Sequence, residues 1–176
     1  MKNTVNISYH KTKIDELIIG SFEDKICILD FCYRKMRQTV DNRIKKYLNA
    51  DFVEQENDVI SQTKKQIDEY LQGQRTAFDV PLLFLGTDFQ KQVWNALMTI
   101  PYGKTVSYLD VATKINHPKA VRAVASVNGA NAIALIVPCH RVIESNGNLG
   151  GYGGGLPVKK RLLKLEQERG LFNNEN

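Results

Sequence analysis

The sequence predicts an α/β protein (α+β in arrangement) of two domains, the first a β-meander with helices and the second mostly helical. Short apolar runs separated by polar turns fill residues 3–34, a pattern typical of a meander. Apolar residues then recur at helical spacing in 37–48 and 56–72. The polar connection Gln72-Gly-Gln-Arg-Thr-Ala precedes the domain boundary that we expect, which gives domains 1–80 and 81–176.

The first domain shows strands and helices but no group of residues that carries chemistry. Ile14 and Leu17-Ile-Ile form one apolar run and Ile26, Ile28 and Phe31 the next, with Glu23-Asp-Lys as the turn between them. We therefore expect this domain to serve packing or support.

Composition bounds the class of protein. The 176 residues are 43% hydrophobic, which is enough to fill a core. The first residues lack the apolar stretch of a signal peptide, and no segment reaches the roughly 18 apolar residues of a membrane span. We expect an intracellular, cytoplasmic protein with no membrane partner. The net charge of +5 permits a polyanionic partner without identifying one.

The cysteines do not indicate a disulfide or a metal site. Cys27, Cys32 and Cys139 form a sparse, odd set, and the histidines add no familiar ligand spacing. Cys139 follows the apolar run Ala134-Leu-Ile-Val-Pro, which we interpret as a short buried strand ended by proline. His140 and Arg141 come next, and an imidazole or a positive charge lowers the pKa of a neighbouring thiol. A lone cysteine after such a run is usually an inert core residue, so its surroundings must decide.

Two short helices before Cys139 have the outline of a helix-turn-helix. Ser107 and Asp110 form an N-cap pair that starts the first helix, Asn116-His-Pro breaks it, and the second runs from Lys119 to about Asn128. On the second helix, one arc is expected to face the core and the other to project outward; the first holds Ala120, Ala123, Val124 and Val127, and the second Arg122, Ala125 and Ser126. Small outward residues around one arginine suit a DNA groove, although an ordinary solvent-facing arginine is the alternative.

Another helix precedes this pair, and the loop between them does not carry a complete phosphate-binding motif. Thr87 and Gln90 have capping-box spacing and open a helix that should bury Trp94. Gly103-Lys-Thr resembles the end of a phosphate-binding loop, but that motif needs a glycine where Met98 stands.

A glycine-rich loop and a final helix close the sequence. Residues 144–155 form either a flexible hairpin or a backbone that approaches a flat ligand closely. The final helix is expected to begin near Pro157 and to stop at Gly170. Glu166 lies on its apolar face, so the carboxylate needs a buried partner: a histidine, an arginine or a backbone amide.

Residues 86–166 resemble the O6-alkylguanine-DNA alkyltransferase family. The motifs that carry the resemblance are Gly-Thr-x-Phe-Gln and Val-Trp at 86–94, Ile-Pro-Tyr-Gly-Lys-Thr at 100–105, Ala-Val-Arg-Ala-Val at 120–124, Asn-Gly-Ala-Asn at 128–131, Pro-Cys-His-Arg-Val-Ile at 138–143, Gly-Tyr-Gly-Gly-Gly-Leu at 151–156 and Leu-Leu-Lys-Leu-Glu at 162–166. The first half is similar to the family's N-terminal domain only in layout. The resemblance implies an RNase H-like first domain and a winged helix-turn-helix-like motif in the second.

The resemblance also implies roles for particular residues. Cys139 would accept the alkyl group, His140 would take its proton through a water, and Glu166 would orient and charge the histidine. Asn131 would brace the turn between the recognition helix and the cysteine, and Tyr108 would help the guanine to leave. Arg122 would insert where the damaged nucleotide has left the stack, in a DNA-contact surface of Tyr108, Arg122, Ala123, Ala125 and Ser126. The base pocket would include Val142, Gly150, Tyr152 and Gly153.

The implied reaction is the repair of double-stranded DNA by a single-turnover methyltransferase. A flipped O6-alkylguanine would transfer its alkyl group to Cys139, with no cofactor and no metal, in a monomer; O4-alkylthymine is left open as a second substrate. Ala132 and Gly153 depart from the family pattern, where proline and, in some members, serine are usual. A DNA-binding relative without transfer activity and a cysteine hydrolase are the alternatives.

Overall fold

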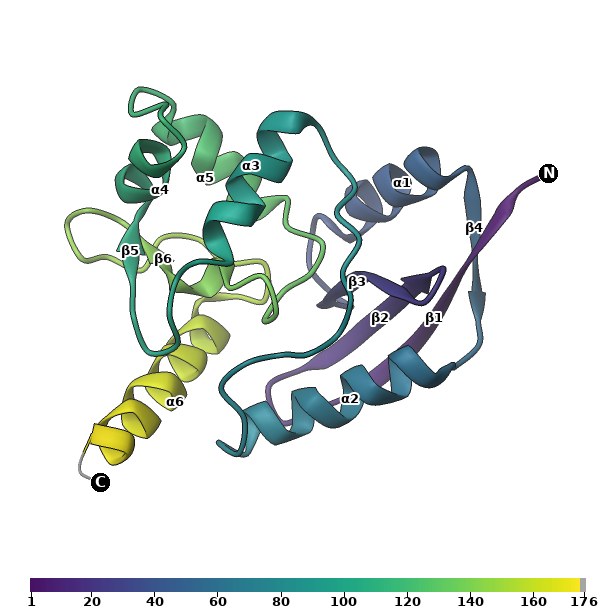
Figure 1. Cartoon of the computed structure of the whole chain (residues 1–176), viewed down its shortest axis with the longest axis horizontal. Helices are drawn as coiled ribbons and strands as arrows, with labels where there is room; N and C mark the ends of the chain where they lie inside the picture. Colours follow the sequence, from purple (N-terminus) through teal and green to yellow (C-terminus); the bar gives the residue numbers. More distant parts are fainter. Residues whose placement is uncertain (175–176) are drawn as a thin grey trace. The chain divides into compact units, whose positions relative to one another are not determined.

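A computed structural model describes residues 1–174, with side chains up to residue 169 (Figure 1). The chain divides into two compact units, Met1–Thr87 and Asp88–Asn176. Mixed α/β architecture is confirmed, with the sheet in the first unit and mostly helices in the second. Within the described residues, no helix is both long and apolar enough to span a bilayer.

The first unit is built on a four-stranded sheet of order β3-β2-β1-β4. The predicted meander is confirmed, because β1 (Asn3–Lys11), β2 (Glu16–Phe22) and β3 (Lys25–Phe31) pair in antiparallel order. The turn at 23–24 joins β2 to β3. The sequence prediction missed β4 (Ala50–Glu54), which pairs parallel to β1. Its five residues include two acidic ones and lack a clean alternation, so no strand signal stood out.

Two helices cover the sheet, α1 (Arg37–Leu48) and α2 (Asp58–Leu71), one on each face in Figure 1. Both follow the predicted helical ranges. The side chain of Asn57 caps α2 by accepting a hydrogen bond from the Ile60 amide at 3.0 Å. The apolar spacing therefore predicted the position of this helix, and the Asn57 cap marks its start.

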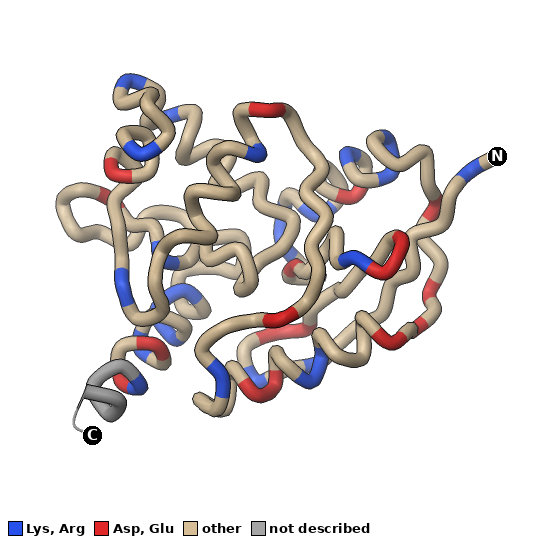
Figure 2. Tube along the Cα trace, in the orientation of Figure 1, with Lys and Arg blue, Asp and Glu red and all other residues tan. Residues whose placement is uncertain are grey.

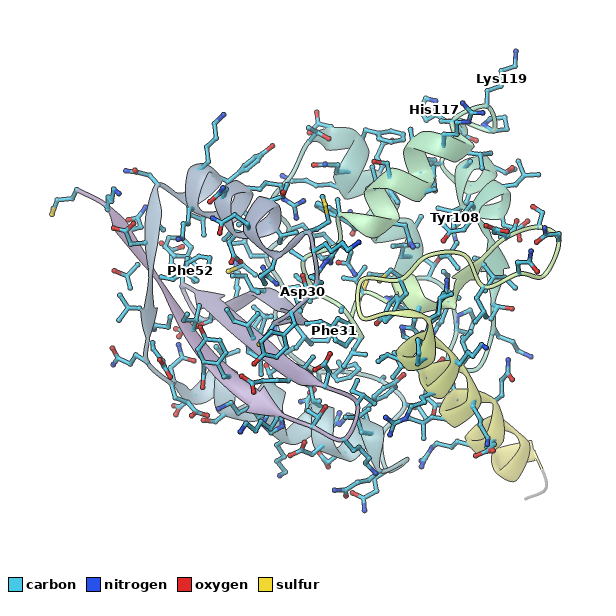
Figure 3. All side chains as sticks on the ribbon, turned by 180° about the vertical axis from the view of Figure 1, so that it is seen from behind. Asp30, Phe31, Phe52, Tyr108, His117 and Lys119 are labelled. Carbon is cyan, nitrogen blue, oxygen red and sulfur yellow. The ribbon has the colours of Figure 1, made fainter. Side chains whose placement is uncertain are left out.

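A buried carboxylate ties α1 to the sheet. Asp30, labelled in Figure 3, stands on β3 with no exposed surface. It forms ion pairs with Arg34 at 3.1 Å and with Arg37, the first residue of α1, at 2.8 Å. Arg37 also bonds Asp41 one helical turn further along. The cluster fixes the start of α1 against the end of β3.

The second unit arranges its helices around a two-strand parallel pair. Its elements are α3 (Asp88–Leu97), β5 (Val106–Ser107), α4 (Tyr108–Lys114), α5 (Val121–Gly129), the 3-10 turn η1 (Cys139–Arg141), β6 (Val142–Ile143) and α6 (Leu156–Asn174). Strand β5 pairs with β6, so the start of α4 lies beside the segment that follows Cys139. The predicted capping box is confirmed, since Ser107 and Asp110 exchange hydrogen bonds of 2.8 and 3.0 Å.

The predicted strand at 134–137 is wrong. These residues are buried, but they form turns stabilised by bonds such as Val137 N to Ile133 O at 3.0 Å. Leu135 has φ of 69°, a left-handed conformation that ends any extended run. A run of four apolar residues indicates burial but cannot distinguish a buried strand from a buried turn.

Two smaller predictions also fail. Ala123 was expected on the buried arc of α5, yet it is exposed together with Arg122, Ala125 and Ser126. The buried stripe of α5 is narrower and consists of Val124, Val127 and Asn128. The final helix was expected to stop at Gly170, but α6 continues to Asn174. A single glycine costs a helix only about 1 kcal/mol, so it does not have to end one.

Candidate active site

The 3-10 turn η1 presents Cys139 as a buried thiol with 6% exposure. Asn131 braces the turn before it: its amide nitrogen donates to Val137 O at 3.0 Å and to Cys139 Sγ at 3.3 Å. Asn128, near the end of α5, donates to the Cys139 carbonyl at 3.3 Å. Asn131 therefore holds the sulfur of Cys139, and Asn128 holds its backbone from α5, the helix whose other face is exposed.

The neighbouring His140 is completely buried and bonds to Glu166 of α6. The distance between His140 Nε2 and Glu166 Oε2 is 2.7 Å. Arg141 donates to the same carboxylate from Nε at 2.8 Å and from Nη2 at 3.0 Å, and the Gly103 amide donates at 3.2 Å. All three kinds of partner that the sequence left open for Glu166 are therefore present together.

The surroundings of Glu166 and His140 set their protonation states. Burial raises the pKa of Glu166, but the hydrogen bonds and charges of His140 and Arg141 outweigh it and lower that pKa to about 2. Burial lowers the pKa of His140 below its ordinary value, with Arg141 and Lys159 acting in the same direction and Glu166 opposing. The resting site thus holds an ionised carboxylate beside a neutral imidazole, which is able to accept a proton.

Lys159, a fully buried lysine on α6, is a further residue of this region that was not predicted. Its ammonium donates to the carbonyls of Val142 at 2.7 Å, Gly151 at 3.3 Å and Leu149, so it fastens the glycine-rich loop to β6. A signal was available, because Lys159 lies seven residues before Glu166 and therefore on the same buried face of the helix. The loop itself forms turns at residues 145–146 and 153–154.

The predicted pocket residues lie around this loop. The hydroxyl of Tyr108, labelled in Figure 3, lies where a Cβ on Gly150 would be only 2.9 Å away, and Gly150 has φ of 72°. Burial, with the nearby Cys139 and Glu144, raises the pKa of Tyr108, so its phenol stays protonated. The ring centroid of Tyr152 is 6.4 Å from that of His140, Val142 is fully buried, and Gly153 is half-buried.

The outward face of α5 carries Arg122, Ala123, Ala125 and Ser126, all exposed. His117 and Lys119 project from the turn between α4 and α5 (Figure 3). Positively charged positions recur along α3, α4, this turn and α6 (Figure 2). Four of the predicted DNA-contact residues are therefore accessible and the fifth, Tyr108, is half-buried. The other predicted catalytic residues are buried: Cys139, His140, Glu166 and Asn131.

The other two thiols differ from Cys139 in their surroundings. Burial raises the pKa of Cys27 to about 12, and burial with the charge of Glu16 raises that of Cys32 to about 11. Neither has a histidine and carboxylate pair beside it in sequence. Among the side chains described up to residue 169, no three His, Cys, Asp or Glu residues converge as metal ligands would.

Comparison with known proteins covers both units. Residues 5–84 match the ribonuclease-like domain of 6-O-methylguanine DNA methyltransferase, and residues 88–168 match its DNA binding domain. The methylated-DNA--protein-cysteine methyltransferase of Methanosarcina barkeri is 40% identical over 157 residues, which cover 89% of this chain and 94% of the relative. That of Mycobacterium tuberculosis is 56% identical over 104 residues, covering 59% of this chain and 63% of the relative.

A solved structure agrees with these matches over nearly the whole chain. The crystal structure of Mycobacterium tuberculosis OGT in complex with DNA superposes with a TM-score of 0.79 at 37% identity, covering 95% of this chain and 94% of that one. The resemblance inferred from the motifs is thereby confirmed, and the chain belongs to the 6-O-methylguanine DNA methyltransferase family.

Proposed function

We propose that this protein repairs DNA by transferring the alkyl group of O6-alkylguanine to Cys139. The observation that carries the proposal is the buried relay beside the thiol: Cys139 is followed by a His140 whose Nε2 lies 2.7 Å from the ionised Glu166. Nucleophile, base and orienting carboxylate are the parts that nucleophilic catalysis requires. Membership of the family and the structural match to a DNA complex support DNA as the partner.

The reaction balances with these groups alone. His140 takes the proton of the Cys139 thiol through the ring nitrogen that does not bond Glu166, and Glu166 stabilises the imidazolium that forms. The thiolate attacks the alkyl carbon, the new S–C bond forms and the C–O6 bond breaks. Guanine leaves with the electron pair, and the protonated phenol of Tyr108 offers it a proton. The product thioether does not hydrolyse, so each chain acts once and needs no cofactor.

The exposed face of α5 supplies the DNA contacts in this proposal. A base inside a duplex cannot reach a buried sulfur, so the nucleotide must leave the stack, at a cost of a few kcal/mol. Small residues on α5 allow close approach to the groove, and Arg122 fills the vacated place. Asn128 connects this helix to the Cys139 carbonyl, so binding and chemistry share one element.

Incubation with duplex DNA carrying a labelled O6-methyl group tests the proposal. We expect at most one label per chain, on Cys139, and none in the Cys139→Ala variant, which should still bind DNA. Cys32→Ser is the matched control and should react like the wild type, because the raised pKa of Cys32 keeps its thiol protonated. Repeated turnover would instead indicate a hydrolase, and DNA binding without transfer a non-reactive relative.

A further inference from the structure

Most of the acceptor capacity of Glu166 is used by groups other than His140. Arg141 donates to Oε1 at 2.8 Å and to Oε2 at 3.0 Å, and the Gly103 amide donates to Oε1 at 3.2 Å. An ionised carboxylate offers about four lone-pair sites. The bond to His140 is therefore one of at least four, and a full positive charge shares the carboxylate with the imidazole.

Resting on the alkyl transfer proposed above, we propose that Arg141 is a positioning residue that shares Glu166 with His140 and so limits how strongly the carboxylate holds a proton on the imidazole. A buried carboxylate whose only partner is a histidine favours the imidazolium. An imidazolium cannot accept the proton of a thiol. By neutralising part of the charge on Glu166, Arg141 leaves His140 oriented by the carboxylate but uncharged at rest.

The structure fixes Arg141 in this role through the turn before β5. Its Nη1 donates to the Ile100 carbonyl at 2.8 Å, and its guanidinium lies 5.6 Å from the Tyr102 ring centroid. Gly103 has φ of 78°, and a Cβ there would come within 3.3 Å of the Glu166 carbonyl oxygen. The Ile-Pro-Tyr-Gly segment thus holds both the arginine and the carboxylate. A lysine keeps the charge at position 141 but cannot reproduce the fork of donors.

The groups around His140 either favour or disfavour the charged form of its ring. Glu166 and Lys159 face it from α6, Tyr152 from the glycine-rich loop, and Cys139 and Arg141 from its own turn. Lys159 and Arg141 both disfavour the imidazolium, while Glu166 favours it. Lys159 bonds three backbone carbonyls, whereas Arg141 acts through the carboxylate itself.

Titration of the histidine ring signals by NMR tests this inference without any DNA. The chain has three histidines, so His10→Gln and His117→Gln variants assign the signals. In the wild type His140 should stay neutral below the ordinary histidine pKa. In Arg141→Gln the pKa of His140 should rise by about one unit or more, because a nearby like charge has been removed. The pH below which methyl transfer fails should rise with it. An unchanged His140 titration in folded Arg141→Gln would overturn the inference.

Arg141→Lys separates the effect of the charge from that of the geometry. It tests the positioning role of Arg141 if Arg141→Gln does not fold. It keeps the positive charge, so the pKa of His140 should stay close to the wild-type value, while loss of the fork should slow transfer about tenfold. A wild-type rate in Arg141→Lys, or a rise in the His140 pKa as large as that expected for Arg141→Gln, would contradict the proposed role. If Cys139 never accepted a methyl group, the proposed function would fail, yet the histidine titration would still report whether the carboxylate is shared.

Discussion

The two units differ in charge and in the use they make of a buried carboxylate. Residues 1–87 contain thirteen Lys or Arg and thirteen Asp or Glu, whereas residues 88–176 contain eleven basic and six acidic ones. All of the formal charge of +5 therefore belongs to the second unit. An overall charge identifies no partner, but its confinement to the unit that holds the helix pair is what a DNA-binding domain requires.

Each unit also buries a carboxylate against arginine, and the pKa values of the two carboxylates shift in opposite directions. Burial raises the pKa of Asp30 although Arg34 and Arg37 oppose it, whereas the hydrogen bonds and charges around Glu166 outweigh its burial and lower its pKa to about 2. Asp30 connects a strand to a helix, and the nearby thiol of Cys32 has its pKa raised to about 11. Glu166 bonds a histidine that adjoins a cysteine. Burial of a charge alone does not mark a reactive site; the partner that can gain or lose a proton does.

Breaking the cluster in the first unit should give the largest effect on stability. Asp30→Asn leaves Arg34 and Arg37 buried without their counter-charge, so we expect the free energy of unfolding to fall by about 3 kcal/mol. Denaturant unfolding measures it. Lys2 and Asp51 form an exposed pair in the same unit, and Asp51→Asn, the matched control, should change stability by less than about 1 kcal/mol. Equal losses would mean that Asp30 is not a structural anchor.

A methyl group added at Gly150 should disturb the second unit next most. Gly150→Ala forces a positive φ on alanine and drives its Cβ into the Tyr108 hydroxyl, so the rate of methyl transfer should fall by at least about tenfold. Gly151→Ala is the control, because a Cβ there meets nothing within 4 Å. Single-turnover rates on duplex DNA compare the two. A wild-type rate of methyl transfer in Gly150→Ala would show that Tyr108 does not take part in the reaction.

Removal of one exposed positive charge should have a smaller effect on the repair rate, and only when the charge lies in the second unit. Arg122→Ala should slow repair of duplex DNA about tenfold while leaving reaction with the free O6-alkylguanine base unchanged, since only the duplex needs the inserted side chain. Lys25→Ala, at an exposed position of the first unit, should change neither rate. Equal effects of Arg122→Ala on the duplex and the free base would show that Arg122 is not a wedge.

Local chemistry in the sequence predicted much of this structure. Helical spacing located α1 and α2, and the Ser107 and Asp110 pair located the start of α4, because caps and apolar periodicity act within a few residues. The apolar face of α6 indicated a buried partner for Glu166, and the structure supplies it in His140. Motif resemblance rather than spacing assigned the roles.

Long-range features could not be predicted in the same way. The left-handed Leu135 turned an expected strand into a turn, and no local signal at Leu135 announces it. The amide of Gly103 meets Glu166 across 63 residues of sequence, so only the fold brings them together. Lys159 was the exception, because its place on the α6 periodicity already indicated burial.

The most direct test of the account compares the two buried carboxylates in one measurement, the single-turnover rate of methyl transfer to Cys139 in folded protein. Glu166→Gln removes the charge that orients and stabilises the His140 imidazolium, and it should lower this rate by about a hundredfold. Asp30→Asn should leave the rate of its folded fraction within about twofold of the wild type, whatever it costs in stability. A Glu166→Gln protein that transfers methyl groups at the wild-type rate would contradict the account, because the carboxylate would then be as purely structural as Asp30.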